Sequence, residues 1–151
     1  MSELSASKPS IKLCSVEIQG SEALFCLMSM DSGLMTTHDC RAARLALQGG
    51  DTEKMRHFQS TFKKLMEDYK VTHVVIRERP KKGKFAGGAD GFKIETAIQL
   101  IDNLKVELIA PQAIKEQLKH TPPPVSAVEA GLKKFQDAAF QTGFAWLNMR
   151  R

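Results

Sequence analysis

The stretch THVVIRE, residues 72–78, decides the fold of this chain. Its β-branched run, Val74 to Ile76, is typical of a strand that is buried on both faces of a sheet. Glu78 closes the stretch, and a loop rich in lysine and glycine follows it directly. A single carboxylate therefore lies between a buried strand and a basic loop, and the surrounding sequence has to explain it.

Upstream of this strand the sequence predicts an antiparallel hairpin and a helix. IKLCSVEI (11–18) reads as a strand ending near Glu17, and ALFCLMSM (23–30) as the returning strand after a tight turn at Gly20. A short third strand is expected near 34–39. Apolar residues spaced three and four apart predict a helix over 52–69. They are Met55, Phe58, Phe62, Leu65, Met66 and Tyr69.

Downstream, strands and helices alternate. Asp90 is the expected N-cap of a helix from about 91 to 104, and VELIA (106–110) is a second buried strand. Pro111 suits the first position of a helix ending near 120. After TPPP (121–124) a long final helix is expected over about 126–148. The order predicts an α/β fold, a mixed sheet with an antiparallel hairpin start and helices on both faces.

Length and composition favour one domain. The chain has 151 residues, and we expect residues 1–10 to form a disordered polar tail and 11–151 a single domain. It contains no apolar run long enough to span a membrane and no secretory signal. Three cysteines without close spacing predict reduced thiols and a cytoplasmic location. Cys14 and Cys26 lie in apolar strands and are expected to act as small buried hydrophobes.

Positive charge is concentrated after the central strand. The formal net charge is +5. Between residues 77 and 84 the chain has a single acid, Glu78, and we assign the basic residues of this segment to nucleic-acid binding. These residues are Arg77, Arg79, Lys81, Lys82 and Lys84. The alternative interpretation is a solvated basic loop without a ligand.

Candidate catalytic acids are placed by the ends of the predicted elements. Sites in open sheets form beyond the carboxyl ends of parallel strands, where Glu17 and Glu78 are expected. Glu129, near the start of the last helix, is the third candidate, although its spacing from Ser126 also fits a capping box. Asp137 is the runner-up; a helical wheel places it opposite an apolar stripe, which favours a solvated position.

Four segments together resemble the ribonuclease H-like fold, and within it the RuvC-type Holliday junction resolvases. CSVEIQGSEA resembles the first-strand motif of these proteins, and HVVIRERP followed by GGADGFKIETAIQLI resembles their strand with a catalytic Glu and the next helix. VELIAPQAIKEQLKH is similar to a later strand and helix, and SAVEA to a pair of acids three residues apart. The likeness covers most of residues 11–147. The chain as a whole is also similar to a small bacterial family of unknown function.

The resemblance implies a nuclease that depends on Mg²⁺ or Mn²⁺ and cuts structured or single-stranded nucleic acid. In that interpretation Glu17 bridges two metal ions, while Glu78 and Glu129 complete the site. The basic loop would contact phosphates, and the resemblance implies a symmetric homodimer.

Departures from the family pattern support a second hypothesis, a catalytically degenerate module that binds nucleic acid or a protein partner. Arg77 stands where alignment places the strand glutamate, so Glu78 comes one residue late and would turn away from Glu17. Glu17 replaces the usual aspartate, and Ser126 replaces an acid. A metabolic enzyme on a similar sheet is a third option, but the sequence lacks a cofactor motif.

Overall fold

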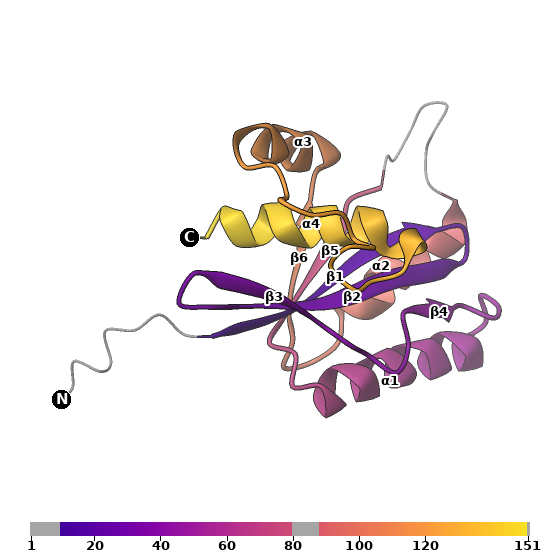
Figure 1. The fold of residues 1–151 in the computed structure, drawn as a ribbon. Helices are drawn as coiled ribbons and strands as arrows, with labels where there is room; N and C mark the ends of the chain where they lie inside the picture. Colours follow the sequence, from indigo (N-terminus) through magenta and orange to yellow (C-terminus); the bar gives the residue numbers. More distant parts are fainter. Residues whose placement is uncertain (1–9, 80–87, 151) are drawn as a thin grey trace.

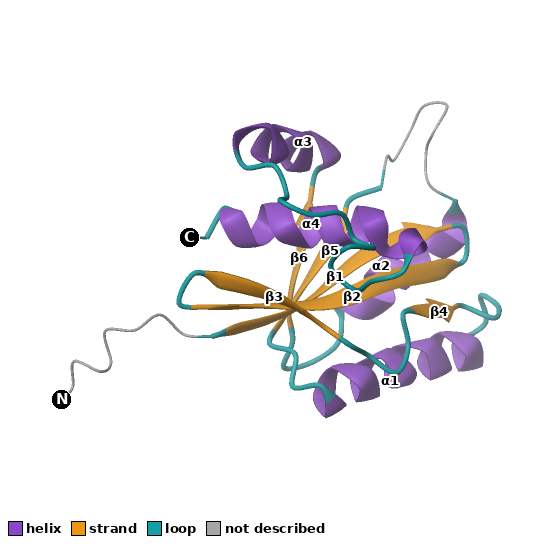
Figure 2. Cartoon of the chain, in the orientation of Figure 1, coloured by secondary structure: helices purple, strands orange, loops and turns teal. Residues whose placement is uncertain are grey.

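The structure, a computed structural model, describes residues 10–79 and 88–150. Its strands alternate with helices after an initial run of strands (Figures 1 and 2). The elements are β1 (Ile11–Gln19), β2 (Glu22–Asp31), β3 (Leu34–His38), β4 (Arg44–Ala46), α1 (Thr52–Asp68), β5 (His73–Arg77), α2 (Ala89–Gln99), β6 (Lys105–Ile109), α3 (Pro111–His120), the 3₁₀ turn η2 (Lys134–Gln136) and α4 (Asp137–Asn148). The predicted tail lies almost wholly outside these described residues.

One mixed sheet of six strands forms the centre of the fold. The strand order is β3-β2-β1-β5-β6, and β4 pairs with β2 beside β3. β1 pairs antiparallel with β2 and parallel with β5, and β5 pairs parallel with β6. The predicted mixed sheet with an antiparallel hairpin start is confirmed. Strand β4 was not expected, because a strand of three residues has too few positions to show alternation.

Helices cover both faces of the sheet, as the sequence predicted. α1 and α2 lie on one face, where Val16, Phe62 and Ile98 belong to one apolar core (Figure 1). α4 crosses the other face, where Val75 and Trp146 belong to the second core. We call these the α1/α2 face and the α4 face. α3 packs on the outer side of α4.

The start of α2 differs from the prediction. The helix begins at Ala89, its N-cap is Gly88, and Asp90 lies in its first turn. It ends at Gln99, and Asn103 adopts a left-handed conformation with φ 63° in the turn before β6. Asp90 is therefore placed to interact favourably with the helix dipole, without being the cap.

The predicted helix over 126–148 is wrong in its first third. Residues after Ser126 form a single turn, closed by a hydrogen bond from the amide of Leu132 to the carbonyl of Ala127. Gly131 takes φ 92°, a conformation that ends a helix. The chain then runs extended at Lys133 before η2, and α4 begins only at Asp137.

Candidate nucleic-acid-binding site

The carboxyl ends of β1 and β5 carry Glu17 and Arg77 side by side. Val16 pairs with Ile76, and the same parallel register sets Glu17 beside Arg77 one residue further on. The Ser15 hydroxyl, two residues before Glu17, donates a 2.6 Å hydrogen bond to the carbonyl of Ala139 in α4. Because side chains alternate along a strand, Glu17 and Arg77 both belong to the α4 face.

Glu78 belongs to the other face of the sheet. Val74 and Ile76 are in the core of the α1/α2 face, and alternation assigns Glu78 to the same side. Its amide donates a 2.9 Å hydrogen bond to the carbonyl of Ile109, so the strand geometry extends to this residue. This register does not support the prediction that Glu17 and Glu78 converge, because an offset of one residue reverses the face.

Glu129 is engaged in a turn. Its carboxylate accepts a 2.9 Å hydrogen bond from the amide of Ser126, and the Ser126 hydroxyl accepts a 3.1 Å bond from the amide of Glu129. These bonds lower the pKa of the Glu129 carboxyl, which is exposed to solvent. The capping-box alternative is confirmed, although it caps a single turn rather than a long helix.

Asp137 is the acid that begins the last helix. α4 runs antiparallel to β1 and β5, since Ala139 contacts Ser15 while Trp146, nearer the helix end, contacts His73 at the start of β5. Asp137 therefore lies toward the carboxyl end of β1, on the face that also carries Glu17. It is half-buried, and its carboxylate accepts a 3.0 Å hydrogen bond from the side-chain amide Nε2 of Gln141. The runner-up acid, and not Glu129, is at the end of the sheet where Glu17 lies.

These acids do not fit a two-ion centre. Within residues 10–79 and 88–150, no three His, Cys, Asp or Glu side chains are grouped so that they could hold a metal ion. Glu17 and Asp137 form at most a pair, and the register one residue beyond the Val16–Ile76 pair brings the positive charge of Arg77, not a third acid, to the same face. The set predicted as metal ligands, Glu17, Glu78 and Glu129, is thus divided between two faces and a surface turn.

Arg79, one of the predicted phosphate contacts, is directed into the domain. Its guanidinium donates a 2.6 Å hydrogen bond to the carbonyl of Ile18 and lies 5.8 Å from the ring centre of Phe92. A Cβ atom added at Gly91 would come within 2.5 Å of the guanidinium carbon. Arg79 therefore holds the end of β1 against the start of α2. The predicted contacts Lys81, Lys82 and Lys84 lie outside the described residues.

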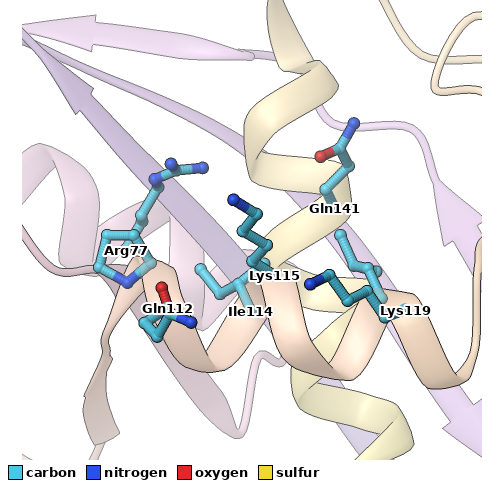
Figure 3. A pocket seen from close by; sticks show the side chains of 8 residues that line it. Arg77, Gln112, Ile114, Lys115, Lys119 and Gln141 are labelled. Carbon is cyan, nitrogen blue, oxygen red and sulfur yellow. The ribbon is translucent and has the colours of Figure 1, made fainter.

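A cationic pocket of about 510 Å³ opens between the end of β5, α3 and α4. Arg77 and Lys115 extend toward the same space beside α4, and Lys119 lies one turn further along α3 (Figure 3). No ion pair or hydrogen bond engages these three side chains within the described part of the chain. The remaining lining residues are Pro111, Gln112, Ile114, Leu118 and Gln141.

The N-terminus of α3 adds a further positive element to this pocket. Its N-cap, Ala110, has no side chain that can accept from the first amides, and Pro111 and Gln112 line the pocket. Free amides at a helix start, together with the helix dipole, favour anions. The pocket is therefore suited to phosphate oxygens.

Of the residues that line this pocket, the sequence analysis assigned only Arg77 to nucleic-acid binding. Lys115 and Lys119 are four residues apart, which places them on one face of α3. That spacing was the available signal, but it does not show which face of the helix is turned toward β5. The contact between α3 and α4, which turns the lysines toward Arg77, depends on tertiary packing.

Several solved structures that this chain resembles are Holliday junction resolvases. The Thermus thermophilus RuvC structure superposes with a TM-score of 0.65 at 9% identity, covering 92% of this chain and 96% of that chain. The fowlpox virus Holliday junction resolvase gives 0.56 at 14% identity, covering 93% and 100%. The yeast mitochondrial Holliday junction resolvase gives 0.53 at 11% identity, covering 97% and 72%. The fold is thus the ribonuclease H-like fold of the RuvC type.

The family is shown by a match over residues 11–146. The chain belongs to the family described as "Protein of unknown function (DUF3010)". No curated protein sequence matches it. Among the described residues, no helix has the length and apolar character needed to cross a bilayer.

Proposed function

We propose that this domain binds nucleic acid through the cationic pocket, as a RuvC-type scaffold without the three-acid metal site. The observation that carries the proposal is the convergence of Arg77, Lys115 and Lys119 on one pocket, without acidic partners among the described residues. Lysine and arginine side chains supply most of the affinity for a phosphate backbone.

The position of the pocket supports the same proposal. Arg77 lies at the carboxyl edge of a parallel strand pair, where open sheets of this kind bind ligands. The side-chain amides of Gln112 and Gln141 add neutral hydrogen-bonding groups beside the cations. One solved neighbour, the T. thermophilus RuvC, is seen in complex with a Holliday junction substrate, with a TM-score of 0.60 at 11% identity. A branched DNA is therefore a natural first ligand.

Binding to a labelled four-way junction, a duplex and a single strand tests the proposal. Arg77→Gln and Lys115→Gln should each weaken binding about three- to tenfold and reduce the salt dependence by about one phosphate contact. Lys64→Gln is the matched control, because Lys64 is paired with Asp68 on α1, away from the pocket. Equal affinities for the wild type and both pocket variants would overturn the proposal.

A nuclease is the second candidate, favoured by the placement of Glu17 and Asp137 at the same end of the sheet. In this candidate Glu17 and Asp137 are the catalytic acids. Glu78 and Glu129 then have no catalytic role. Incubation of the same three substrates with Mg²⁺ or Mn²⁺ tests it. Cleavage that is lost in Glu17→Gln and Asp137→Asn, and kept in Glu78→Gln and Glu129→Gln, would establish this candidate. Binding without cleavage would leave the first proposal standing alone.

The homodimer implied by the resemblance stays a prediction. Sedimentation of the free protein and of its complex with a four-way junction would measure the number of copies bound.

A further inference from the structure

A second cluster of charged and aromatic side chains lies at the opposite end of the sheet from the cationic pocket. His73 begins β5, Lys105 and Glu107 lie on β6, and Trp146 and Arg150 come from the end of α4 and the residues after it. Together with Val106 they line a cavity of about 290 Å³. We call this group the Trp146 cluster.

Arg150 is held in one position within the Trp146 cluster. Its guanidinium carbon lies 3.5 Å from the ring centre of Trp146, and one terminal nitrogen donates to the Trp146 carbonyl at 3.2 Å. The other terminal nitrogen donates to both carboxylate oxygens of Glu107, at 2.8 and 3.0 Å. Within residues 10–79 and 88–150 the Nε–H and one terminal N–H make no hydrogen bond, so Arg150 is a fixed cation with free donors.

Trp146 supplies a donor that has no acceptor. The residue is 1% exposed, and its buried indole N–H makes no hydrogen bond within the described part of the chain. A buried donor left without a partner destabilises the folded state.

His73 can supply a further donor. The Thr72 hydroxyl lies 3.0 Å from the carbonyl of Lys12 and 2.8 Å from Nδ1 of His73, and when it donates to the carbonyl it accepts from a protonated Nδ1. Nε2 has no partner among the described residues and carries a hydrogen whenever the ring is protonated. Burial lowers the pKa of the His73 imidazole. The positive charges of Lys105 and Arg150 lower it further, whereas the negative charge of Glu107 raises it.

We propose that the Trp146 cluster binds a tetrahedral oxyanion of the phosphate class. Lys105 is exposed and makes no ion pair within the described residues, while Glu107 is already engaged by Arg150. An oxyanion in the cavity would accept from the free donors of Arg150 and from Lys105, beside the ring of Trp146. The site is separate from the cationic pocket and does not depend on the function proposed for it.

Trp146 is the only tryptophan of the chain, so its fluorescence reports on this site alone. Titration of the whole protein with inorganic phosphate, at ionic strength held constant with KCl, should give a saturable change in emission and raise the melting temperature. Lys105→Gln should weaken binding about tenfold, because it removes a charge-assisted hydrogen bond. Lys64→Gln is the matched control and should bind as the wild type does, because Lys64 is paired with Asp68 on α1, away from both pockets.

The pH dependence is measured with sulfate, whose charge is constant between pH 5 and 8. Protonated His73 adds a charge and a donor, so sulfate should bind about threefold or more tightly at pH 5.5 than at pH 8. His73→Gln should remove that difference. The charged groups around His73 are Lys105, Arg150 and Glu107, with Lys12 behind Thr72.

Two results would overturn the proposal. One is the absence of both a saturable emission change and thermal stabilisation with phosphate or sulfate. The other is binding that Lys105→Gln and His73→Gln leave unchanged. A short thymidine oligonucleotide that competes with phosphate for the emission change would support the site and identify a phosphodiester as its ligand.

Discussion

At the scale of single residues, the order of Arg77 and Glu78 decides what chemistry the sheet edge can perform. The strand position next to Glu17 on the α4 face holds Arg77, whereas Glu78, one residue later, belongs to the α1/α2 face. A repulsive cation takes the place at which a second carboxylate would complete an ion site. The electrostatic character of this edge therefore depends on one position.

Replacing Arg77 by glutamate should convert this edge into a divalent-ion site. Arg77→Glu sets a second carboxylate beside Glu17, with Asp137 at the same end of the sheet, and Mn²⁺ affinity should rise about tenfold or more. Isothermal titration calorimetry measures the change. Glu78→Gln is the control and should leave Mn²⁺ binding unchanged. A loss of Mn²⁺ binding in Glu78→Gln would contradict the assignment of Glu78 to the α1/α2 face.

The buried thiols predict a loss of stability in alkali. Cys14 and Cys26 are buried, as the sequence predicted, and burial raises the pKa of Cys26 to about 12. Burial, with Cys26 and Cys40 nearby, raises that of Cys14 as well. An unfolded thiol has a pKa of about 8.5, so above that pH the unfolded chain releases protons that the folded chain keeps.

Unfolding free energy should therefore fall by about 1.4 kcal/mol per pH unit for each buried thiol above about pH 9. Urea titrations between pH 8 and 10.5 measure this slope. Cys26→Ala should remove one thiol's share, whereas Cys40→Ala, at a half-exposed position, should leave most of the slope in place. Identical slopes for the wild type and Cys26→Ala would contradict the assignment.

At the scale of elements, α4 lies unusually close to the sheet because of a glycine. A Cβ atom added at Gly143 would lie 2.5 Å from the Met28 sulfur and 3.0 Å from the Ser15 Cβ. Met28 and Ser15 are themselves buried, on neighbouring strands. α4 can pack this closely against β1 and β2 only while position 143 carries no side chain.

Gly143→Ala should destabilise the protein by about 1–3 kcal/mol, since overpacking exceeds the helix-propensity gain of about 1 kcal/mol. Urea unfolding followed by circular dichroism measures the loss. In the double variant Gly143→Ala with Met28→Ala, the removed methionine makes room for the new methyl. The two changes should then cost at least about 0.5 kcal/mol less than their sum. Strict additivity would show that the helix does not depend on this close approach.

Periodicity and turn chemistry predicted most elements but could not fix their ends. The apolar stripe of α1 and the β-branched run of β5 are strong local signals, and both elements were found where expected. The stretch from Ser126 to Lys133 carries a plausible helical pattern, yet Gly131 takes a positive φ and stops it. In the sequence, a glycine fits both a continuing helix and the end of one. The end at Gly131 depends on the packing of this turn against β3, through the hydrogen bond from the Thr37 hydroxyl to the Ala130 carbonyl.

At the scale of the whole molecule, the fold could be predicted and the candidate site only in part. Strand and helix order is enough to define a mixed sheet with two covered faces, because few topologies satisfy that order. The site depends on register between β1 and β5 and on the rotation of α3, which are set by long-range contacts. Arg77 was therefore identified as a cation at the right edge, whereas its neighbours Lys115 and Lys119 and the Trp146 cluster were not.

The double pairing of β1 has a consequence for the order in which the chain folds. β1 forms nine residue pairs with β2, and only the two residues Gly20 and Ser21 connect these strands. By contrast, the hydrogen bond between Lys12 of β1 and Thr72, just before β5, joins residues that are 60 positions apart. Loop closure is entropically cheaper for the hairpin. We therefore expect the β1–β2 ribbon to be native-like in the transition state. In stopped-flow experiments Leu27→Ala should mainly slow refolding, and Leu108→Ala in β6 should mainly accelerate unfolding.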